Sequence, residues 1–199
     1  MAALARPKTV AIIAVFAALT VALNLSPVKF PAPFAPFLIY QIWEVPIVTA
    51  FLIHGPIVGV MISIINTMAL LVVFPGALPT GPFYNLAAVL SMLSGIYISE
   101  KWVINRMKGK GERIQMAFSS LLGIVSRVGI MTVVNAIFLP FPPPIGFDMP
   151  MAAVIAIMPL IGLFNATLAL YTIPLGYFLQ KAVCSAMKIR RWGSPATDS

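Results

Sequence analysis

The sequence has few of the residues on which soluble proteins and metalloproteins depend. Only 9% of its 199 residues are charged, whereas a typical soluble domain has about 25%. It contains five acidic residues, one cysteine and one histidine. The single Cys184 excludes an internal disulfide, and the single His54 lacks the further His and Cys ligands that a zinc site requires. The composition therefore argues against a soluble fold and against a zinc centre.

The sequence also lacks the common catalytic and nucleotide-binding motifs. It has no G-x-x-x-x-G-K-[ST], no H-E-x-x-H and no G-x-S-x-G, so neither an enzyme nor a P-loop ATPase is predicted. Ion-driven carriers usually have several acids inside the membrane and often an internal repeat. This chain has one such acid, Glu44, and no convincing repeat between residues 1–100 and 101–199. An autonomous secondary carrier or channel is kept as an alternative. A membrane-embedded enzyme or structural subunit is a second alternative, which the missing catalytic motifs disfavour.

Long apolar runs fill most of the chain. Hydrophobic residues make up 60% of the sequence, and the mean hydropathy is +1.00. A membrane-spanning helix needs about 20 mainly apolar residues, and prolines mark several ends of the runs. Six spans are predicted over residues 9–25, 38–54, 56–74, 83–100, 115–139 and 159–180. The prediction is an all-α, integral-membrane six-helix bundle that forms a single domain over residues 1–199.

Two boundaries of these spans leave alternatives. Arg6 and Lys8 before the first run resemble the start of a signal peptide, but no small-x-small cleavage site follows, so the run is kept as a span. Pro159 suits the first turn of the last helix, which would leave 148–158 along the membrane surface. A longer last helix that begins near Met149 is the alternative.

Positive charge is confined to one side of the predicted bundle. The N-terminus, the loop 101–114 and the C-terminal tail hold eleven of the thirteen Lys and Arg residues: Arg6, Lys8, Lys101, Arg106, Lys108, Lys110, Arg113, Lys181, Lys188, Arg190 and Arg191. Cytoplasmic loops collect Lys and Arg, so both termini are predicted to be cytoplasmic. Bases at helix ends indicate anchoring to anionic lipid rather than binding of nucleic acid. The proline-rich loops are therefore predicted to lie outside.

Each predicted span carries one amide or carboxylate in its outer half. At about 1.5 Å of rise per residue, all six lie about 3–12 Å below the outer boundary. They are Asn24, Glu44, Asn66, Asn85, Asn135 and Asn165. Asn side chains also hold membrane helices together, which is the alternative reading. Because all six have a similar depth, we predict a shared polar pocket.

Aromatic residues, among them Phe37, Tyr40 and Tyr84, gather in the same outer zone. Interfacial aromatic belts are common, but several of these residues lie in loops rather than at helix ends. Apolar aromatic walls with a few amides suit a flat, partly polar organic molecule. An inorganic ion is a poor fit because only one carboxylate is present.

Arg127 is the other charge inside a predicted span. It lies near the middle of 115–139, where insertion costs about 2.5–3.5 kcal/mol. Three alternatives are open for its charge: it reaches toward the inner face, pairs with Glu44 or binds carbonyls at a helix end. By helix rise it is about 9 Å from Glu44 along the membrane normal, so direct pairing would need a long reach. A structural or coupling role is predicted for Arg127, rather than contact with a ligand.

Three stretches of the chain resemble a known family. They are Pro33–Leu38 with Trp43-Glu-Val-Pro46 and Gly55-Pro-Ile-Val-Gly59, then Pro79-Thr-Gly-Pro-Phe-Tyr-Asn85, and Arg127-Val-Gly-Ile-Met-Thr-Val-Val-Asn135-Ala-Ile-Phe-Leu-Pro140. Together they resemble the substrate-binding S components of energy-coupling factor (ECF) vitamin transporters, and most of all the riboflavin-specific group. The resemblance extends along nearly the whole chain.

The resemblance implies a subunit that binds riboflavin from outside and delivers it with a transmembrane T component and two ATPases. ATP would be used only by those partners, and no cofactor is expected. The resemblance also implies a location in the plasma membrane of a prokaryote. It also implies that Glu44, Asn135 and Asn165 are polar ligand contacts. The chain departs from the riboflavin group at Leu168, where that group tends to have Lys, so an S component for a different vitamin or small organic molecule is the alternative.

Small residues recur along the first span. Ala14, Ala18 and Ala22 form a small-xxx-small stripe, which lets helices approach closely. The family couples to its partner through small residues on this helix, so the resemblance implies that the stripe faces the T component. The alternative is that the stripe packs within this protein's own bundle.

Overall fold

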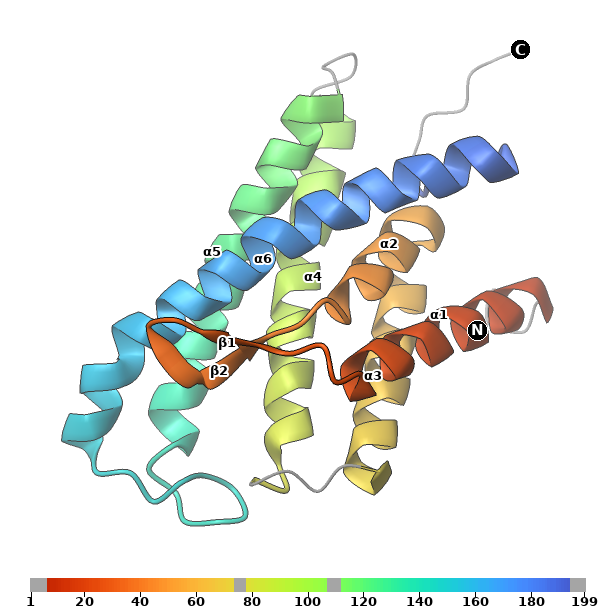
Figure 1. Cartoon of the computed structure of the whole chain (residues 1–199). Coiled ribbons are helices and arrows are strands. Elements are labelled where there is room, and N and C mark those ends of the chain that lie inside the picture. Colours follow the sequence, from red (N-terminus) through yellow and green to blue (C-terminus); the bar gives the residue numbers. More distant parts are fainter. Residues whose placement is uncertain (1–6, 74–77, 107–111, 194–199) are drawn as a thin grey trace.

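The structure is a computed structural model and describes residues 7–73, 78–106 and 112–193. Six helices and one short hairpin make up the described part, in the order α1 Pro7–Leu25, β1 Phe30–Ala32, β2 Ala35–Tyr40, α2 Glu44–His54, α3 Pro56–Val73, α4 Gly81–Arg106, α5 Glu112–Phe138 and α6 Met151–Met187 (Figure 1). The predicted six-helix bundle is confirmed. Arg6, Lys108 and Lys110, which entered the charge argument, lie outside the described residues.

Five of the helices, α1, α3, α4, α5 and α6, are long and apolar enough to cross a membrane. The exception among the described helices is α2, whose 11 residues make a rod only about 16 Å long. A bilayer core is about 30 Å thick, so α2 does not reach across it. The prediction of a full second span over 38–54 is therefore wrong.

The first residues of that predicted span belong to a hairpin. β1 and β2 are antiparallel, with Phe30 opposite Tyr40 and Pro31 opposite Ile39. Prolines in this stretch exclude a helix, because they lack the N–H and clash with the preceding turn. The apolar run that ends at Tyr40 is a strand instead, and α2 begins only at Glu44. Hydropathy alone does not separate these two conformations.

The last helix is longer than the main prediction. α6 runs from Met151 for 37 residues and contains Pro159 and Pro174 in its interior. The predicted surface segment 148–158 is therefore wrong, and the alternative of a helix that begins near Met149 is the one found. Pro150 stands just before the helix with an extended backbone, and a proline there needs no helical N–H partner.

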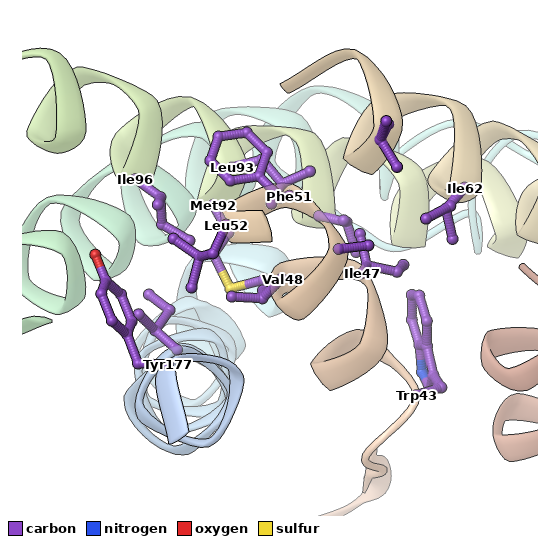
Figure 2. Packing of buried hydrophobic residues seen from close by; sticks show 14 of the residues in the cluster. Trp43, Ile47, Val48, Phe51, Leu52, Ile62, Met92, Leu93, Ile96 and Tyr177 are labelled. Carbon is purple, nitrogen blue, oxygen red and sulfur yellow. The ribbon is translucent and has the colours of Figure 1, made fainter. Parts of the chain in front are cut away.

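The core surrounds α2. Every residue of α2 from Glu44 to Ile53 is buried, and its side chains meet those of α3, α4 and α6 in one cluster (Figure 2). A helix that is apolar on all sides belongs in the interior of a larger assembly. Gly176 lets α6 lie close against α2, since a Cβ there would be 2.5 Å from Val48 Cγ1. The short helix is thus the packed centre of the bundle.

Candidate binding site

A cavity of about 620 Å³ lies at one end of the bundle. It is enclosed by β2, the start of α2, parts of α4, α5 and α6, and the connection between α5 and α6. The lining is mostly apolar and consists of Phe37, Leu38, Ile39, Gln41, Trp43, Glu44, Tyr84, Asn85, Ala88, Arg127, Met131, Asn135, Leu139, Phe147, Met149, Ile157, Ile161, Phe164, Asn165 and Leu168. Four of the six predicted polar residues therefore face one cavity.

Two opposite charges meet in the wall of this cavity. The guanidinium of Arg127 forms two parallel contacts with the carboxylate of Glu44, from Nη1 to Oε2 at 2.5 Å and from Nη2 to Oε1 at 2.9 Å. Each residue is only 2% exposed. The bidentate geometry matches the planar fork of arginine and leaves the pair with no net charge. The cavity thus contains an ion pair that is already neutralised.

This pairing is one of the three possibilities that the sequence left open for Arg127, and only the depth estimate that made it a long reach is wrong. The depth estimate counted Glu44 from residue 38, at the supposed outer end of a spanning helix. In the structure Glu44 is the first residue of the short α2, so its depth cannot be counted by helix rise from residue 38. Arg127 also lines the cavity, and the prediction that it does not contact the ligand stays a prediction.

Arg127 fixes the orientation of Asn165. Its Nε donates to Asn165 Oδ1 at 3.0 Å, and Asn165 Nδ2 donates to the carbonyl of Ile161 at 2.9 Å. Arginine has donors only, so the amide oxygen must face it. The amide nitrogen keeps a second N–H, and Asn165 therefore offers the cavity a donor.

Asn135 has the opposite polarity. Its Nδ2 donates to the carbonyl of Met131 at 2.7 Å, which places the amide nitrogen because a carbonyl only accepts. Its Oδ1 accepts no hydrogen bond from the described residues, and this atom is not fully buried. Asn135 thus offers an acceptor where Asn165 offers a donor, and a ligand with both kinds of group fits this pair.

Regular spacing places these residues on common helix faces. Arg127, Met131, Asn135 and Leu139 follow one another at intervals of four in α5 and its C-terminal end, and all line the cavity. Positions four apart share one face of a helix. On α6, Ile157, Ile161, Asn165 and Leu168 follow at intervals of four, four and three, which also keeps them on one face. This periodicity is the sequence signal that would have found Met131 and Ile161.

Two of the predicted polar residues do not share the cavity. Asn24 Nδ2 donates to Asn66 Oδ1 at 3.4 Å, and this contact joins α1 to α3. Neither residue lines the cavity. For Asn24 and Asn66 the prediction of a shared pocket is wrong, and the alternative of amides that hold helices together applies.

Tyr40 also lies behind the cavity wall. Its hydroxyl is 2.6 Å from Thr167 Oγ1, and its ring packs at 4.9 Å from the ring of Phe164, which does line the cavity. It borders a smaller hollow of about 200 Å³ together with Tyr171. Tyr40 therefore supports the wall, whereas Phe37 and Tyr84 face the cavity.

The connection between α5 and α6 forms the remaining wall. Phe147 and Met149 of this connection line the cavity. Phe147 is one of the aromatic residues of the predicted outer zone, whereas the sequence did not indicate Met149. Two side chains tie the connection to the start of α4: Thr80 Oγ1 donates to the carbonyl of Pro144 at 2.6 Å, and the Tyr84 hydroxyl donates to the carbonyl of Ile145 at 3.0 Å. The connection between α5 and α6 is thus bonded to the chain at the start of α4.

The alanine stripe lies on another face of the molecule. Ala14, Ala18 and Ala22 are exposed on α1, while Ile13 and Ala17 are buried against the bundle. The alternative that the stripe packs within this protein's own bundle is therefore wrong.

The fold is similar to that of a solved structure, the S component of a bacterial ECF transporter. The two chains superpose with a TM-score of 0.70 and are 20% identical, over 91% of this chain and 98% of the other. No protein-family model and no curated protein sequence matches the chain. At this identity the likeness establishes the fold: the chain has the S-component fold.

Proposed function

We propose that this protein is the substrate-binding subunit of an ECF-type vitamin transporter and that riboflavin is its ligand. The observation that carries the proposal is the cavity of about 620 Å³ beside the Arg127–Glu44 pair, in a chain with the S-component fold. Pockets for small organic ligands have volumes of about 300–1,000 Å³. The volume supports a ligand of vitamin size.

The polar groups of the cavity support a flavin. One edge of a flavin ring carries an N–H between two carbonyl groups, and Asn135 and Asn165 offer the complementary acceptor and donor. Phe37 and Tyr84 supply aromatic walls, and Asn85 adds a further amide. Because Glu44 is already paired with Arg127, the site suits an uncharged ring system.

A different uncharged vitamin is the second candidate. Leu168, which stands where the riboflavin group tends to have Lys, is buried in the cavity wall and offers no hydrogen bond. An autonomous carrier is less well supported, because the single acid in the cavity is held in an ion pair and gives no proton relay.

The proposal extends to partners and location. The protein works in the plasma membrane of a prokaryote, with both termini cytoplasmic, and is not itself an enzyme. Ala14, Ala18 and Ala22 present an exposed small-residue surface to a T component, and two partner ATPases hydrolyse ATP. The chain needs no cofactor of its own.

Flavin titration tests this function. Purified wild-type protein is expected to quench riboflavin fluorescence on binding. Asn135→Leu and Asn165→Leu leave a buried polar group of the ligand unpaired, which costs about 1–3 kcal/mol or roughly tenfold to a hundredfold in affinity. Asn66→Leu is the matched control, since it makes the same change outside the cavity and is expected to leave the affinity unchanged.

Two outcomes of the titration would contradict the proposal. If the wild type does not quench, riboflavin is the wrong ligand, and Leu168 is the first residue to examine. If the wild type binds and all three variants bind equally well, the ligand lies elsewhere in the molecule.

A further inference from the structure

The chain turns back on itself after α6. Lys188 has a left-handed backbone with φ 52° and ψ 37°, and the N–H of Ile189 donates to the carbonyl of Cys184 at 3.1 Å. This is the geometry of a helix C-cap, in which a left-handed residue closes the last turn. Residues 188–193, called here the tail segment, are thereby directed over the end of the bundle opposite the cavity.

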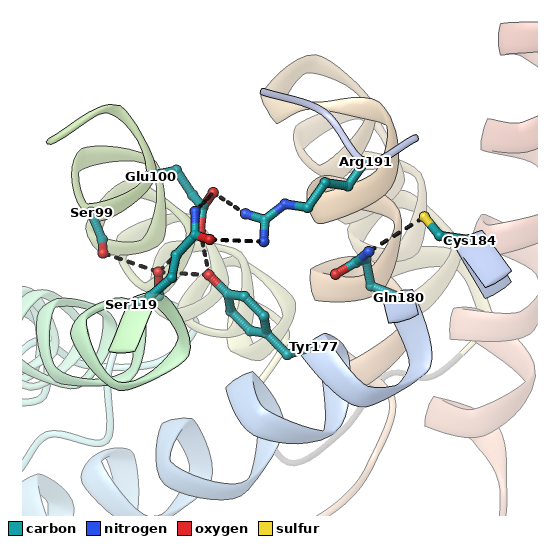
Figure 3. A network of polar contacts seen from close by, with 8 residues as sticks. Ser99, Glu100, Ser119, Tyr177, Gln180, Cys184 and Arg191 are labelled. Atoms are coloured by element: carbon teal, nitrogen blue, oxygen red, sulfur yellow. Dashed lines mark hydrogen bonds and ion pairs between the residues drawn. The ribbon is translucent and has the colours of Figure 1, made fainter. Parts of the chain in front are cut away.

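Arg191 of the tail segment reaches a buried carboxylate. Its guanidinium pairs with Glu100 of α4, which is 0% exposed, and its Nη1 donates to Gln115 Oε1 at 3.3 Å (Figure 3). Glu100 also accepts from Gln115 Nε2 at 2.9 Å, from Ser119 Oγ at 3.3 Å and from the Tyr177 hydroxyl. Donors from α5, α6 and the tail segment therefore meet on one carboxylate of α4.

Trp192 of the tail segment caps α2. Its backbone N–H donates to the carbonyls of Leu52 at 3.2 Å and Ile53 at 3.0 Å. The last four carbonyls of a helix have no partner within it, so this N–H satisfies groups that α2 leaves open. The tail segment is thus bonded directly to the end of α2.

The indole ring of Trp192 covers the same helix end. It stacks on Tyr97 at 6.0 Å and meets Phe51 edge-on at 6.1 Å. A Cβ on Gly55 would lie 2.9 Å from Trp192 Cδ1, so the ring fits against a position where any side chain would collide. Trp192 is therefore held by shape as well as by hydrogen bonds.

The short helix α2 is consequently fixed at both ends. Glu44 at its start is paired with Arg127 in the cavity wall, and its last turn is bonded to Trp192. The residues between are buried, so the rod has no free face along which to shift independently. We propose that Arg191 and Trp192 are positioning residues of the cavity, because they set the place of α2 and α2 sets the place of Glu44.

The proposal has a reciprocal consequence. If the docked tail segment favours one position of α2, then a ligand that binds to that position stabilises the docked tail segment by the same factor. This coupling rests on the proposed function, because it takes riboflavin as the ligand. The positioning role of Arg191 and Trp192 concerns the ligand-free protein alone.

Hydrogen exchange of the ligand-free protein tests the positioning role of Arg191 and Trp192. In Trp192→Ala and Arg191→Gln, amides across α2 are expected to exchange at least about tenfold faster, including residues 45–49 beside the cavity. Residues 128–138 of α5 are expected to keep their wild-type rates. Lys188→Asn is the matched control, since it removes one positive charge from the tail segment and keeps a residue that tolerates the left-handed conformation.

Three results would overturn the positioning role. Unchanged exchange in α2 would show that the tail segment only rests on the bundle. Faster exchange confined to residues 50–55 would show that Trp192 caps one turn without affecting the cavity end. An equal acceleration across α5 as well would show a general loss of stability.

Experiments with riboflavin test the coupling between the cavity and the tail segment. Saturating riboflavin is expected to slow exchange at residues 188–193 of the wild type and to dissociate at least about tenfold faster from Trp192→Ala. Bound riboflavin without either effect would overturn the coupling. If the wild type binds no riboflavin, the proposed ligand fails, whereas the exchange of ligand-free α2 still decides the positioning role.

Discussion

Glu44 and Glu100 are both buried carboxylates that pair with an arginine, yet their surroundings differ. Arg127 supplies both of the hydrogen bonds that the structure records for Glu44, and it holds Asn165 as well. Glu100 has donors from three further side chains besides Arg191. The carboxylate beside the cavity thus depends on one partner, whereas the one at the opposite end has several.

The difference separates a cavity with unused polar groups from a carboxylate whose neighbours bond to one another. At the Glu44 end, Asn135 and Asn165 each keep a polar group that no described protein atom uses. At the Glu100 end, side chains of α4, α5, α6 and the tail segment use one another's donors and acceptors. A cavity with unused hydrogen-bonding groups suits a ligand. A network of side chains bonded to one another suits a rigid contact between helices.

Loss of Arg127 is expected to have the largest effect. Arg127→Met leaves Glu44 buried without a partner, and removal of one member of a buried ion pair costs about 3–5 kcal/mol. Thermal unfolding in detergent is expected to show this loss, together with loss of riboflavin binding. Adding Glu44→Gln to Arg127→Met is expected to restore stability but not binding, because Asn165 is still released. Recovery of both would show that Arg127 has only a structural role.

Arg191→Gln is expected to have a smaller effect. Glu100 keeps Gln115, Ser119 and Tyr177 as donors, so the loss is about 1–3 kcal/mol, as for one charged hydrogen bond. The same unfolding measurement checks it, with Lys188→Asn as the control. If Arg191→Gln destabilised the protein as much as Arg127→Met, the contrast between the two carboxylates would be wrong.

Ala18→Leu is expected to have almost no effect on the isolated protein. Ala18 is exposed and touches neither carboxylate, so the stability change is about 0.5 kcal/mol or less and riboflavin affinity is unchanged. Co-purification with a T component is expected to fall sharply, because the added bulk keeps the two helices apart. Val15→Leu, at an exposed position beside the stripe, is the control. Normal co-purification of Ala18→Leu would remove the stripe from the partner interface.

Hydropathy predicted most of the fold because most helices are long and apolar. The predicted span 56–74 matches α3 at Pro56–Val73, and 115–139 matches α5 at Glu112–Phe138. The errors occur at the hairpin and at the start of α6. There the apolar content is high, and conformation depends on where prolines fall relative to the helix ends.

Depth along a helix predicted part of the site. Helix rise gives the height of a residue but not the direction in which its side chain points. Asn135 and Asn66 both lie in the outer halves of their predicted spans, yet Asn135 lines the cavity and Asn66 pairs with Asn24 instead. The contact of Arg191 with Glu100 joins residues 91 positions apart, and no local pattern indicates such a pairing.

The shortness of α2 also bears on the order in which the protein is assembled. Glu44 is synthesised 83 residues before Arg127, its partner, so the growing chain carries an unpaired acid through α3, α4 and the first half of α5. A helix of 11 residues cannot span the bilayer meanwhile and has to wait for later helices to enclose it. A nascent chain that stops after α4 is therefore expected to leave residues 44–53 open to protease, and insertion is completed only when the last two helices arrive.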